Sequence, residues 1–459
     1  MFKKVLVANR GEIAVQIIRA LHDMNIIAVA VYSSADQDSL FVSLADEAIK
    51  IGGPQPSDSY LNMAEIISAA NLTGCEAIHP GYGFLSENAE FAALCAECHI
   101  KFIGPNEDII QLMGDKSNAR LAMKKAGVPV IPGSDGVVSD VKDAKQIADE
   151  IGYPILLKSA AGGGGKGIRR VDRSADLESA FLSTQQEARI SYNDDDIYVE
   201  KLLTHTKHIE MQVIADNFGN IVYLPERDCS LQRNHQKVIE ESPCSEISPN
   251  ERQYLGDIVT KATRSLHYTN TGTFEFLMDR EHNFYFMEMN TRLQVEHTIS
   301  EEVTGIELIK AMILVAAGEE LPFGQDKAVL KGYAIECRLN AEDPYQGFVP
   351  QPGKITHLYL PDGSLGVRFD SGIVQGSFIS PFYDSMIAKV IVHLDDRQTA
   401  VNKMNRILTE LEIGGVMTNQ DFLKVILHSD GFISGEFDTS YLEEEILKPQ
   451  EVTNGNGEI

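Results

Sequence analysis

The 459-residue chain has few basic residues relative to acidic ones, and it has no long apolar run. Lys and Arg number 40 against 67 Asp and Glu, which gives a formal net charge of −27. Because such a surplus of negative charge repels phosphate backbones, we expect no nucleic-acid partner. No apolar stretch reaches the roughly 20 residues that a transmembrane helix needs, so we expect no membrane association. Anionic ligands are then expected only in local basic pockets.

Cysteines are also scarce, and the start of the chain does not resemble an export signal. The six cysteines are scattered, and the opening MFKKVLVANRGEIAVQ has a strand and helix pattern without a cleavage site of small residues. We therefore expect a reducing, cytoplasmic location. The segment CAECH at residues 95–99 matches the attachment pattern of c-type haem. We interpret Cys95 and Cys98 as core residues instead, because they fall on the apolar face of an amphipathic helix.

The chain is too long for one core, and its pattern changes twice. Residues 1–104 alternate strands and helices, which is typical of a parallel sheet covered by helices. The next region, to residue 330, begins with a helical stretch at 106–127 and continues mainly with β-like segments. Beyond it, strands separated by turn residues precede two closing helices, and the polar residues 448–459 are expected to be disordered. The fold class is mixed α/β, in several domains.

A glycine-rich loop, AAGGGGKG, occupies residues 160–167. Gly162, Gly164 and Gly167 match the dinucleotide fingerprint, but that fingerprint needs a following helix, and the β-like IRRV follows here. The loop also fails as a Walker motif, because a glycine stands where Ser or Thr should follow Lys166. We expect a hairpin whose backbone N–H groups close over phosphates. An ordinary structural hairpin is the alternative, which the entropy cost of ordering four glycines disfavours.

Three lysines are candidates to bind the same phosphates: Lys116, Lys158 and Lys237. Each taken alone is more typical of a surface residue. Lys158 is the exception, because it ends an otherwise apolar strand and a buried ammonium group needs an anion.

Two acids and an amide are expected to meet on one face of a β-hairpin. The segments TFEFL and NFYFMEMN are separated by a few polar residues, which predicts a hairpin. If Glu275 lies opposite Glu288, then Asn290 follows on the same face. Carboxylate and amide oxygens suit Mg²⁺. A salt-bridged sheet surface is the alternative, but two acids on one face repel each other without a cation.

Polar residues continue at alternate positions beyond this hairpin, in MEMNTRLQVEH at residues 287–297. An extended chain would bring Arg292, Gln294 and Glu296 to the same face as the acids. The Arg292 guanidinium can bind a small oxyanion through two parallel hydrogen bonds, and Glu296 can accept a proton. This arrangement suits the attack of a small oxygen acid on a γ-phosphoryl group, which gives an acyl phosphate.

A series of motifs from Phe2 to about Leu447 resembles the biotin carboxylases of the ATP-grasp superfamily. The motifs are ANRGEIA, AIHPGYGFLSEN, MGDK, KSAAGGGGKG, ERDCSLQRNHQKVIEE, GTFEF, EMNTRLQVEH, ECRLNAEDP and YDSMIAK. The resemblance implies a Rossmann-like domain at 1–104, an ATP-grasp domain at 105–330 with a mobile lid at about 131–204, and a β-rich domain at 331–447. It also implies a homodimer that carboxylates biotin with ATP and bicarbonate through carboxyphosphate, with Mg²⁺ or, as a substitute, Mn²⁺.

The resemblance further implies roles for individual residues. ATP contacts are implied for Lys116, Lys158, Gly164, Gly165, Glu200, Lys201, Leu202, Leu203, His208, His235, Glu275 and Glu288. Metal binding is implied for Glu275, Glu288 and Asn290, and bicarbonate binding for Lys237, Arg292, Gln294 and Val295. Glu296 is the implied base, Arg338 is implied to stabilise the biotin enolate, and Tyr82 to lie near the biotin ring. Lys237, Arg292, Glu296 and Arg338 form the implied catalytic set.

Biotin itself is expected on another protein. LAMKKAG resembles a biotin-attachment site, but that site lies on a β-hairpin, whereas Lys124 here lies in a helical pattern. The chain also ends before a carrier or carboxyltransferase domain, so the resemblance implies a separate biotin carboxyl carrier protein and carboxyltransferase subunits. Such subunits serve most often in acetyl-CoA carboxylase and fatty acid biosynthesis. Propionyl-CoA and pyruvate systems share the module, so the complex stays open.

Three other interpretations are disfavoured by the residues themselves. Another ATP-grasp ligase, such as one making carbamoyl phosphate, is disfavoured by RLQVEH and ECRLNAEDP. A dehydrogenase would need a helix after the glycine loop. A nucleotide-sensing protein without catalysis would have lost Glu288, Arg292 or Glu296, and all three are present.

Overall fold

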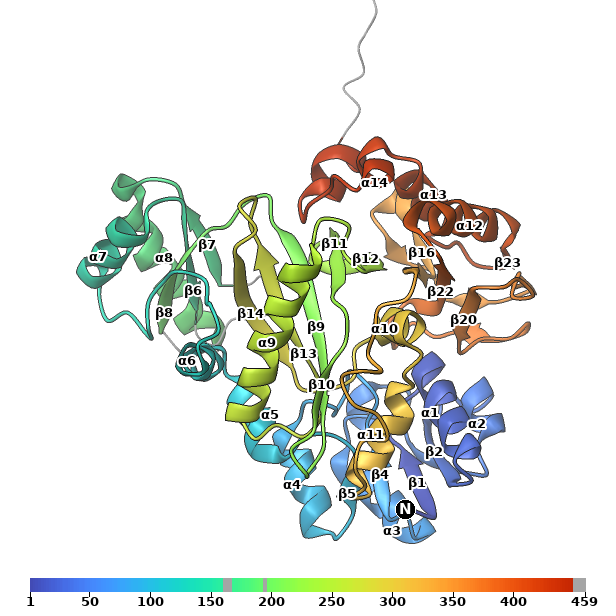
Figure 1. Ribbon diagram of the computed structural model, residues 1–459. Coiled ribbons are helices and arrows are strands. Elements are labelled where there is room, and N and C mark those ends of the chain that lie inside the picture. The colour runs from blue at the N-terminus through green and yellow to red at the C-terminus, as the bar shows by residue number, and fades with distance from the viewer. Residues whose placement is uncertain (160–166, 193–195, 449–459) are drawn as a thin grey trace, which may run out of the picture.

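The structure is a computed structural model that describes residues 1–159, 167–192 and 196–448. Its N-terminal region is a parallel sheet covered by helices, drawn in blue in Figure 1, with strand order β3-β2-β1-β4-β5. The strands are β1 (Lys4–Val7), β2 (Ile27–Ser33), β3 (Glu47–Gly52), β4 (Ala77–His79) and β5 (Lys101–Phe102). The helices are α1 (Gly11–Asp23), α2 (Leu40–Leu44), the 3₁₀ turn η1 (Pro56–Asp58), α3 (Met63–Thr73) and α4 (Ala89–Glu97). The predicted parallel sheet is confirmed.

The sequence pattern did not reveal β3, and it placed the cysteine pair correctly. Strand β3 lies at the sheet edge and has only one fully buried residue, so it lacks the apolar run that reveals a buried strand. Cys95 on α4 is fully buried in the core, and Cys98 packs partly buried against the same cluster. The haem pattern is therefore a coincidence of helix packing.

Two helices and a small antiparallel sheet follow. The predicted single helical stretch is two helices, α5 (Glu107–Gly114) and α6 (Lys116–Ala126), because Asp115 between them caps α6 by accepting from the N–H of Asn118. Lys124 lies on α6, as predicted, and pairs with Asp135. The sheet has the order β7-β6-β8, with β6 (Ile155–Ser159), β7 (Ile168–Val171) and β8 (Ile197–Lys201). Helices α7 (Val141–Ile151) and α8 (Leu177–Tyr192) cover it, with the 3₁₀ turn η2 (Ser174–Asp176) before α8.

This small sheet forms a body of its own, which stands apart from the C-terminal region in Figure 1. It has a separate apolar core that includes Leu157, Phe181 and Val199. A strand, not a helix, follows the glycine loop, so the dinucleotide fingerprint is excluded there. The expected phosphate-covering residues Gly164 and Gly165 lie outside the described residues.

A large antiparallel sheet joins the middle of the chain to its C-terminal part. Its strand order is β14-β13-β9-β11-β12-β15-β22-β20, with β10 paired to β9. The strands are β9 (Lys207–Ala215), β10 (Ile221–Tyr223), β11 (Arg227–Arg233), β12 (Gln236–Ser242), β13 (Asn270–Met278), β14 (Phe284–Asn290), β15 (Tyr333–Asn340), β20 (Val367–Ser371) and β22 (Met386–Leu394). Its helices are α9 (Pro249–Ser265), α10 (His297–Thr304) and α11 (Leu308–Ala316). Because β12 pairs with β15, one sheet crosses the predicted domain boundary near residue 330.

The C-terminal region adds short strands and helices around the end of this sheet (Figure 1). The strands are β16 (Glu342–Asp343), β17 (Val349–Pro350), β18 (Gly353–Lys354), β19 (His357–Tyr359), β21 (Phe378–Ile379) and β23 (Glu412–Gly414). The helices are the 3₁₀ turn η3 (Pro344–Gln346), α12 (Arg397–Glu410), α13 (Gln420–Leu427), α14 (Asp430–Ser434) and the π turn η4 (Leu442–Ile446). Two closing helices were predicted. The five-residue α14 was missed because it is too short to show helical periodicity.

In the part of the chain that the structure describes, no helix has both the length and the apolar character to cross a bilayer.

A close approach of two backbones joins the C-terminal sheet to the N-terminal region, and it predicts a stability defect. A Cβ added to Gly372, just beyond β20, would lie 2.7 Å from the Glu12 nitrogen and from the Gly11 carbonyl carbon. Gly372→Ala should lower the free energy of unfolding by about 1–3 kcal/mol, the usual cost of overpacking. Gly363→Ala is the matched control, because no atom lies within 4 Å of its added Cβ. Equal denaturation midpoints for the two variants would contradict the close approach.

Candidate active site

The hairpin β13–β14 carries the acids that were expected to meet. Glu275 pairs directly with Glu288, and Thr273 with Asn290. The side-chain amide of Asn290 donates to Glu275 Oε1 at 2.6 Å. Burial and the nearby charge of Glu275 raise the pKa of Glu288, as expected when two acids share one face. The predicted register of the hairpin is confirmed.

The alternating row does not continue as a strand beyond this hairpin, so that part of the prediction is wrong. Strand β14 ends at Asn290, and Glu296 is already the N-cap of α10. The residues between them form a loop whose C-terminal end is held by buried donors. The Gln294 amide donates to Glu275 Oε1 at 2.7 Å, and the Lys389 ammonium donates to the Val295 carbonyl at 2.8 Å. The expected convergence on Glu275 therefore comes from loop packing, not from strand periodicity.

Strand β9 supplies a second polar row. His208, Glu210 and Gln212 stand at alternate positions of a strand that is buried along its whole length. Glu210 pairs with Glu275 on β13 and with Arg227 on β11, so all three side chains share one face. No role was predicted for Glu210, Gln212 or Arg227. Their signal was available, because polar residues at every second position of an otherwise apolar strand mark a buried polar face.

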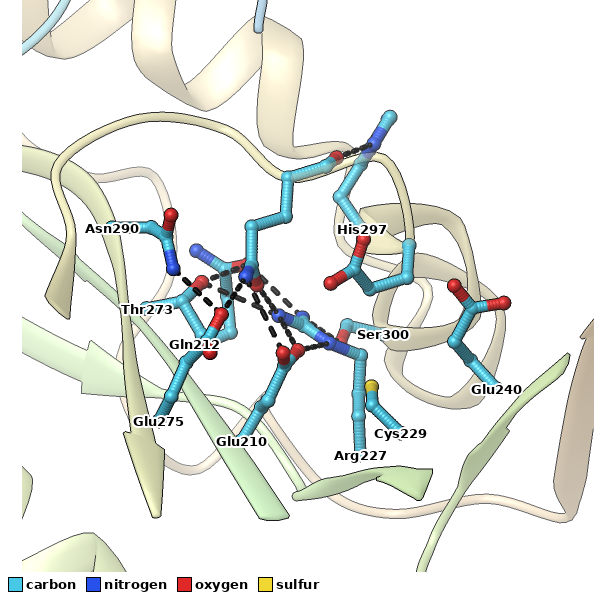
Figure 2. Close-up of polar contacts among 12 residues, drawn as sticks. Glu210, Gln212, Arg227, Cys229, Glu240, Thr273, Glu275, Asn290, His297 and Ser300 are labelled. Atoms are coloured by element: carbon cyan, nitrogen blue, oxygen red, sulfur yellow. Dashed lines mark hydrogen bonds and ion pairs between the residues drawn. The ribbon is translucent and has the colours of Figure 1, made fainter. Parts of the chain in front are cut away.

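Arg227, on the neighbouring strand β11, binds two residues of this row, and Figure 2 shows its guanidinium group directed at Glu210. It has no exposed surface. Its Nε donates to Glu210 Oε2 at 3.0 Å, and its Nη1 donates to Gln212 at 3.1 Å. Further donor contacts reach Ser300, Thr273 and the Gln294 side-chain oxygen. A buried guanidinium needs this many acceptors, so Arg227 fixes both the sheet face and the loop that carries Gln294.

Lys237, on β12, lies among three carboxylates. Its ammonium contacts Glu210, lies 2.6 Å from Glu296 Oε1 and lies 3.3 Å from Glu275 Oε1. Burial alone would lower the pKa of Lys237, but the three carboxylates hold it well above its ordinary value. Burial likewise opposes ionisation of Glu210 and Glu275, yet Lys237 keeps their pKa values below normal. The cluster is fully charged at neutral pH.

His208 carries a further positive charge beside this cluster. Its Nε2 lies 2.9 Å from Glu275 Oε2 and 3.3 Å from Glu210 Oε1. Burial opposes protonation, but Glu275 raises the pKa of His208 to about 9. His208 is therefore an imidazolium at neutral pH, able to meet an anion.

Arg338 lies on a strand, as predicted, and from β15 it reaches the same cluster of charged side chains. Its Nε donates to Glu240 Oε1 at 2.5 Å, and its Nη2 donates to Glu296 Oε2 at 2.9 Å. Glu296 thus lies between the Arg338 guanidinium and the Lys237 ammonium, and it is 2 % exposed. Despite burial, these cations lower the pKa of Glu296, so the group is an ionised carboxylate.

Arg292 and Tyr82 connect this site to the N-terminal region. The Arg292 Nε donates to Glu87 Oε2 at 2.8 Å, and its Nη2 donates to Asn290 Oδ1 at 2.8 Å. The Tyr82 hydroxyl donates to Glu12, whose Oε1 lies 3.0 Å from the Lys389 ammonium. Neither Glu87 nor Glu12 was expected, since ion pairs across some 200 residues leave no local pattern.

The remaining expected ATP residues lie on the small sheet and at the edges of the cluster. Lys158 pairs with Glu200, so the anion required by its partial burial comes from the protein itself. Lys201 donates to the Gly152 and Tyr153 carbonyls at 3.0 Å each, and Leu202 and Leu203 follow it beyond the end of β8. Lys116, at the first turn of α6, and His235, in the turn after β11, are both exposed.

Among the described residues, two groups of side chains that could hold a metal overlap the ion-pair cluster, and one of them is Glu210, Cys229 and Glu296. The other lies closer to the proposed metal ligands. Ligand atoms of His208, Glu210 and Glu275 lie within 4.8 Å of one another. The Lys237 ammonium already contacts two of these carboxylates, so this group holds a fixed cation of the chain. Glu288 lies opposite Glu275 on the neighbouring strand, and it is not one of the three carboxylates that Lys237 contacts. It is therefore the carboxylate best suited to bind a metal.

This geometry defines an ATP-grasp ligase, and the comparisons with known proteins agree. The model of the ATP-binding domain of the carbamoyl-phosphate synthase L chain matches residues 115–323. The models of the biotin carboxylase N-terminal and C-terminal domains match residues 1–110 and 336–444.

Individual relatives cover almost the whole chain. It is 51 % identical to biotin carboxylase 1 of Bacillus subtilis, over 96 % of this chain and 98 % of that one. It is 50 % identical to a pyruvate carboxylase subunit of Methanothermobacter thermautotrophicus, over 97 % and 90 %. The solved biotin carboxylase domain dimer of Hydrogenobacter thermophilus 2-oxoglutarate carboxylase, in complex with MgADP, ADP and bicarbonate, has a TM-score of 0.91, 48 % identity, and coverage of 97 % and 98 %. The chain belongs to the biotin carboxylase family, and its activity is the ATP-dependent carboxylation of biotin.

The buried role of Arg227 predicts a large stability effect. Arg227→Met leaves the Glu210 carboxylate without one of its cations and removes a donor from four neutral acceptors. The free energy of unfolding should fall by about 3–5 kcal/mol, the cost of breaking a buried ion pair from one side. Urea denaturation followed by circular dichroism measures it. Arg280→Met, at an exposed turn, is the control, and similar losses in both variants would contradict the assignment.

Proposed function

We propose that the chain activates bicarbonate with ATP to carboxyphosphate and then carboxylates biotin carried by a separate carrier protein. The observation that supports this most is the position of Glu296, an ionised carboxylate held between Lys237 and Arg338. Carboxylate, ammonium and guanidinium together suit a small oxygen acid that must be bound and deprotonated. The solved Hydrogenobacter thermophilus relative holds bicarbonate and MgADP, which supports the same substrates here.

In the first half-reaction, Lys237 and Arg292 supply positive charge to bicarbonate, with Gln294 and the Val295 backbone beside them. Glu296 accepts the proton of bicarbonate, because its carboxylate is already ionised and lies in the same cleft. Gln294 is held by Arg227 and Glu275, so its amide is oriented before substrate arrives. The oxyanion that results is the nucleophile for the γ-phosphoryl group.

The metal proposal is that Glu275, Glu288 and Asn290 hold Mg²⁺, which Mn²⁺ can replace. The residues fit, because Glu275 and Glu288 are opposed across two strands and each acid disfavours the other's charge without a cation. When bound, Mg²⁺ supplies neutralisation of the phosphate charge of ATP. Glu288 keeps its carboxylate available for this role, whereas Glu275 is oriented by the Asn290 amide.

The nucleotide is proposed to lie between the large sheet and the small one. His208 offers an imidazolium, and Lys116 lies near enough to Glu288 to lower its pKa. Lys158 and His235 are proposed to bind the same nucleotide. Closure of the lid, residues 131–204, would bring the β8 end at Lys201 to Leu203 onto the adenine. The separate apolar core of this segment supports its motion as one body. The division of the chain at 104/105, 330/331 and 447/448 is part of the same proposal.

The assembly is proposed to be a homodimer in the cytoplasm that serves a carboxyltransferase through a biotin carboxyl carrier protein. The dimer in the solved Hydrogenobacter thermophilus relative supports the first point. We propose acetyl-CoA carboxylase as the complex. Pyruvate carboxylation is a second candidate, favoured by the 50 % identity to the Methanothermobacter thermautotrophicus pyruvate carboxylase protein. Fixation of labelled bicarbonate by the purified complex, with acetyl-CoA, propionyl-CoA, pyruvate or 2-oxoglutarate offered in turn, distinguishes the candidates.

The metal proposal predicts a specific loss. Glu288→Gln removes a charge from the site that neutralises phosphate, so bicarbonate-dependent ATP cleavage should fall about 100-fold or more, while the circular dichroism spectrum is unchanged. Glu281→Gln, on the exposed turn of the same hairpin, should cleave ATP normally. The rate is followed by phosphate release over a Mg²⁺ titration. Normal turnover of the Glu288 variant at ordinary Mg²⁺ would refute the site.

The proposed role of Arg338 separates the two half-reactions. A guanidinium beside the ureido oxygen stabilises the charge that develops when biotin is deprotonated, and losing one such donor costs roughly 10²–10³ in rate. Arg338→Gln should therefore lose biotin carboxylation far more than biotin-independent ATP cleavage. Arg397→Gln breaks another Arg–Glu pair, with Glu241, and should leave the ratio of the two rates as in wild type. A parallel loss of both activities in the Arg338 variant would show a structural role.

A further inference from the structure

Two buried carboxyl groups lie beside Arg338, and the mechanism above uses neither of them. Glu240 on β12 and Glu336 on β15 are directly opposed in the antiparallel register. Both have no exposed surface. Directly opposed residues bring their Cβ atoms to about 4.5–5.5 Å, so the two side chains share one small volume of the interior. Two full negative charges there would repel each other strongly.

Each carboxyl group has one oxygen engaged and one oxygen without a partner. Glu240 Oε1 accepts from the Arg338 Nε at 2.5 Å, and Glu336 Oε2 accepts from the Thr298 hydroxyl. The other two oxygens, Glu240 Oε2 and Glu336 Oε1, are buried and have no hydrogen-bond partner among the described residues. A buried oxygen left unpaired is costly, and one proton placed between the two groups would satisfy both.

The surrounding charges favour one proton on the pair. The titratable and charged groups around it are Arg338 and Cys337 on β15, Lys237 on β12, Cys229 on β11, Glu296 before α10, Lys389 on β22 and Tyr82. Arg338 already serves Glu240 and Glu296, and the Lys389 ammonium lies 3.0 Å from Glu12. No cation among the described residues makes an ion pair with Glu336. Burial raises the pKa of Glu240 to about 7 and that of Glu336 to about 8.

We propose that Glu240 and Glu336 are a proton-sharing carboxyl pair in which Glu336 carries the proton and ionised Glu240 positions the Arg338 guanidinium for biotin. The inference rests on the proposed role of Arg338. Glu240 is a positioning residue, since it acts through Arg338, and Glu336 keeps it ionised by holding the proton. With Glu296 on its other side, the guanidinium is fixed by two carboxylates from two different elements.

The pair gives a pH dependence that a purely structural contact would not. As pH falls through about 7, Glu240 gains a proton and loses the charge that orients Arg338. As pH rises through about 8, Glu336 ionises, and a second negative charge draws the guanidinium from the cleft. The ratio of biotin carboxylation to biotin-independent ATP cleavage should therefore be greatest between these values and fall on both sides.

The experiment measures that ratio from pH 6 to 9 in the full-length wild type and three variants, on free biotin. Glu240→Gln should lower the ratio roughly 10- to 100-fold, the effect of a lost charge-assisted hydrogen bond, and flatten its pH profile. Glu336→Gln mimics the protonated, neutral form of Glu336. In this variant the ratio should therefore no longer fall at alkaline pH, but it should still fall at acid pH. Glu241→Gln, on the opposite face of β12 beside Arg397, should keep the wild-type profile.

The proposal would be overturned if Glu240→Gln kept the wild-type ratio. It would also be overturned if the ratio in Glu336→Gln no longer fell at acid pH. A second measurement does not need activity: the infrared band of a protonated carboxylic acid should be present in wild type at pH 7 and absent from Glu336→Gln. If the Glu240 variant does not fold, absence of that band in wild type still refutes the proposal. Failure of the Arg338 role is distinct, because Arg338→Gln would then lose both activities in parallel.

Discussion

The site depends on one ammonium group that three carboxylates surround. Lys237 meets Glu210 from β9, Glu275 from β13 and Glu296 from the start of α10, so a single charge ties four elements together. None of these groups could be buried alone, because each needs an opposite charge at hydrogen-bond distance. The same condition makes the cluster responsive: any anion or metal that enters must compete with partners already in place, and binding therefore rearranges existing ion pairs.

The large sheet explains how residues from distant regions reach that ammonium. The pairing of β12 with β15 places Arg338 beside Glu296, and the antiparallel return of β14 places Glu288 opposite Glu275. The N-terminal region closes the other side through the Glu87–Arg292 pair. The charged side chains of the cluster are thus held largely by one continuous framework of hydrogen-bonded strands, whereas the small sheet has an apolar core of its own.

The sequence predicted what local periodicity and motif order encode. The parallel sheet, the opposed acids Glu275 and Glu288 and the strand carrying Arg338 were all expected, because each is a regular pattern of two or of 3.6 residues. The loop between Asn290 and His297 was misread as strand, since its alternation is real but its conformation is set by Arg227 and Lys389 from elsewhere. The alternation on β9 could have indicated a buried polar face that includes Glu210, but not its partners on three other strands. Long-range ion pairs are invisible to any local window.

The contrast between the acidic chain and its buried cations bears on how substrates enter. A surface with net charge −27 repels bicarbonate and nucleotide at a distance, and salt screens that repulsion within a Debye length of about 8 Å. His208, which is buried, and Lys237, which is partly buried among three carboxylates, act only at contact, where salt screens them less. Moderate ionic strength should therefore speed the arrival of anions while changing little how firmly they are held, the opposite of electrostatically steered association.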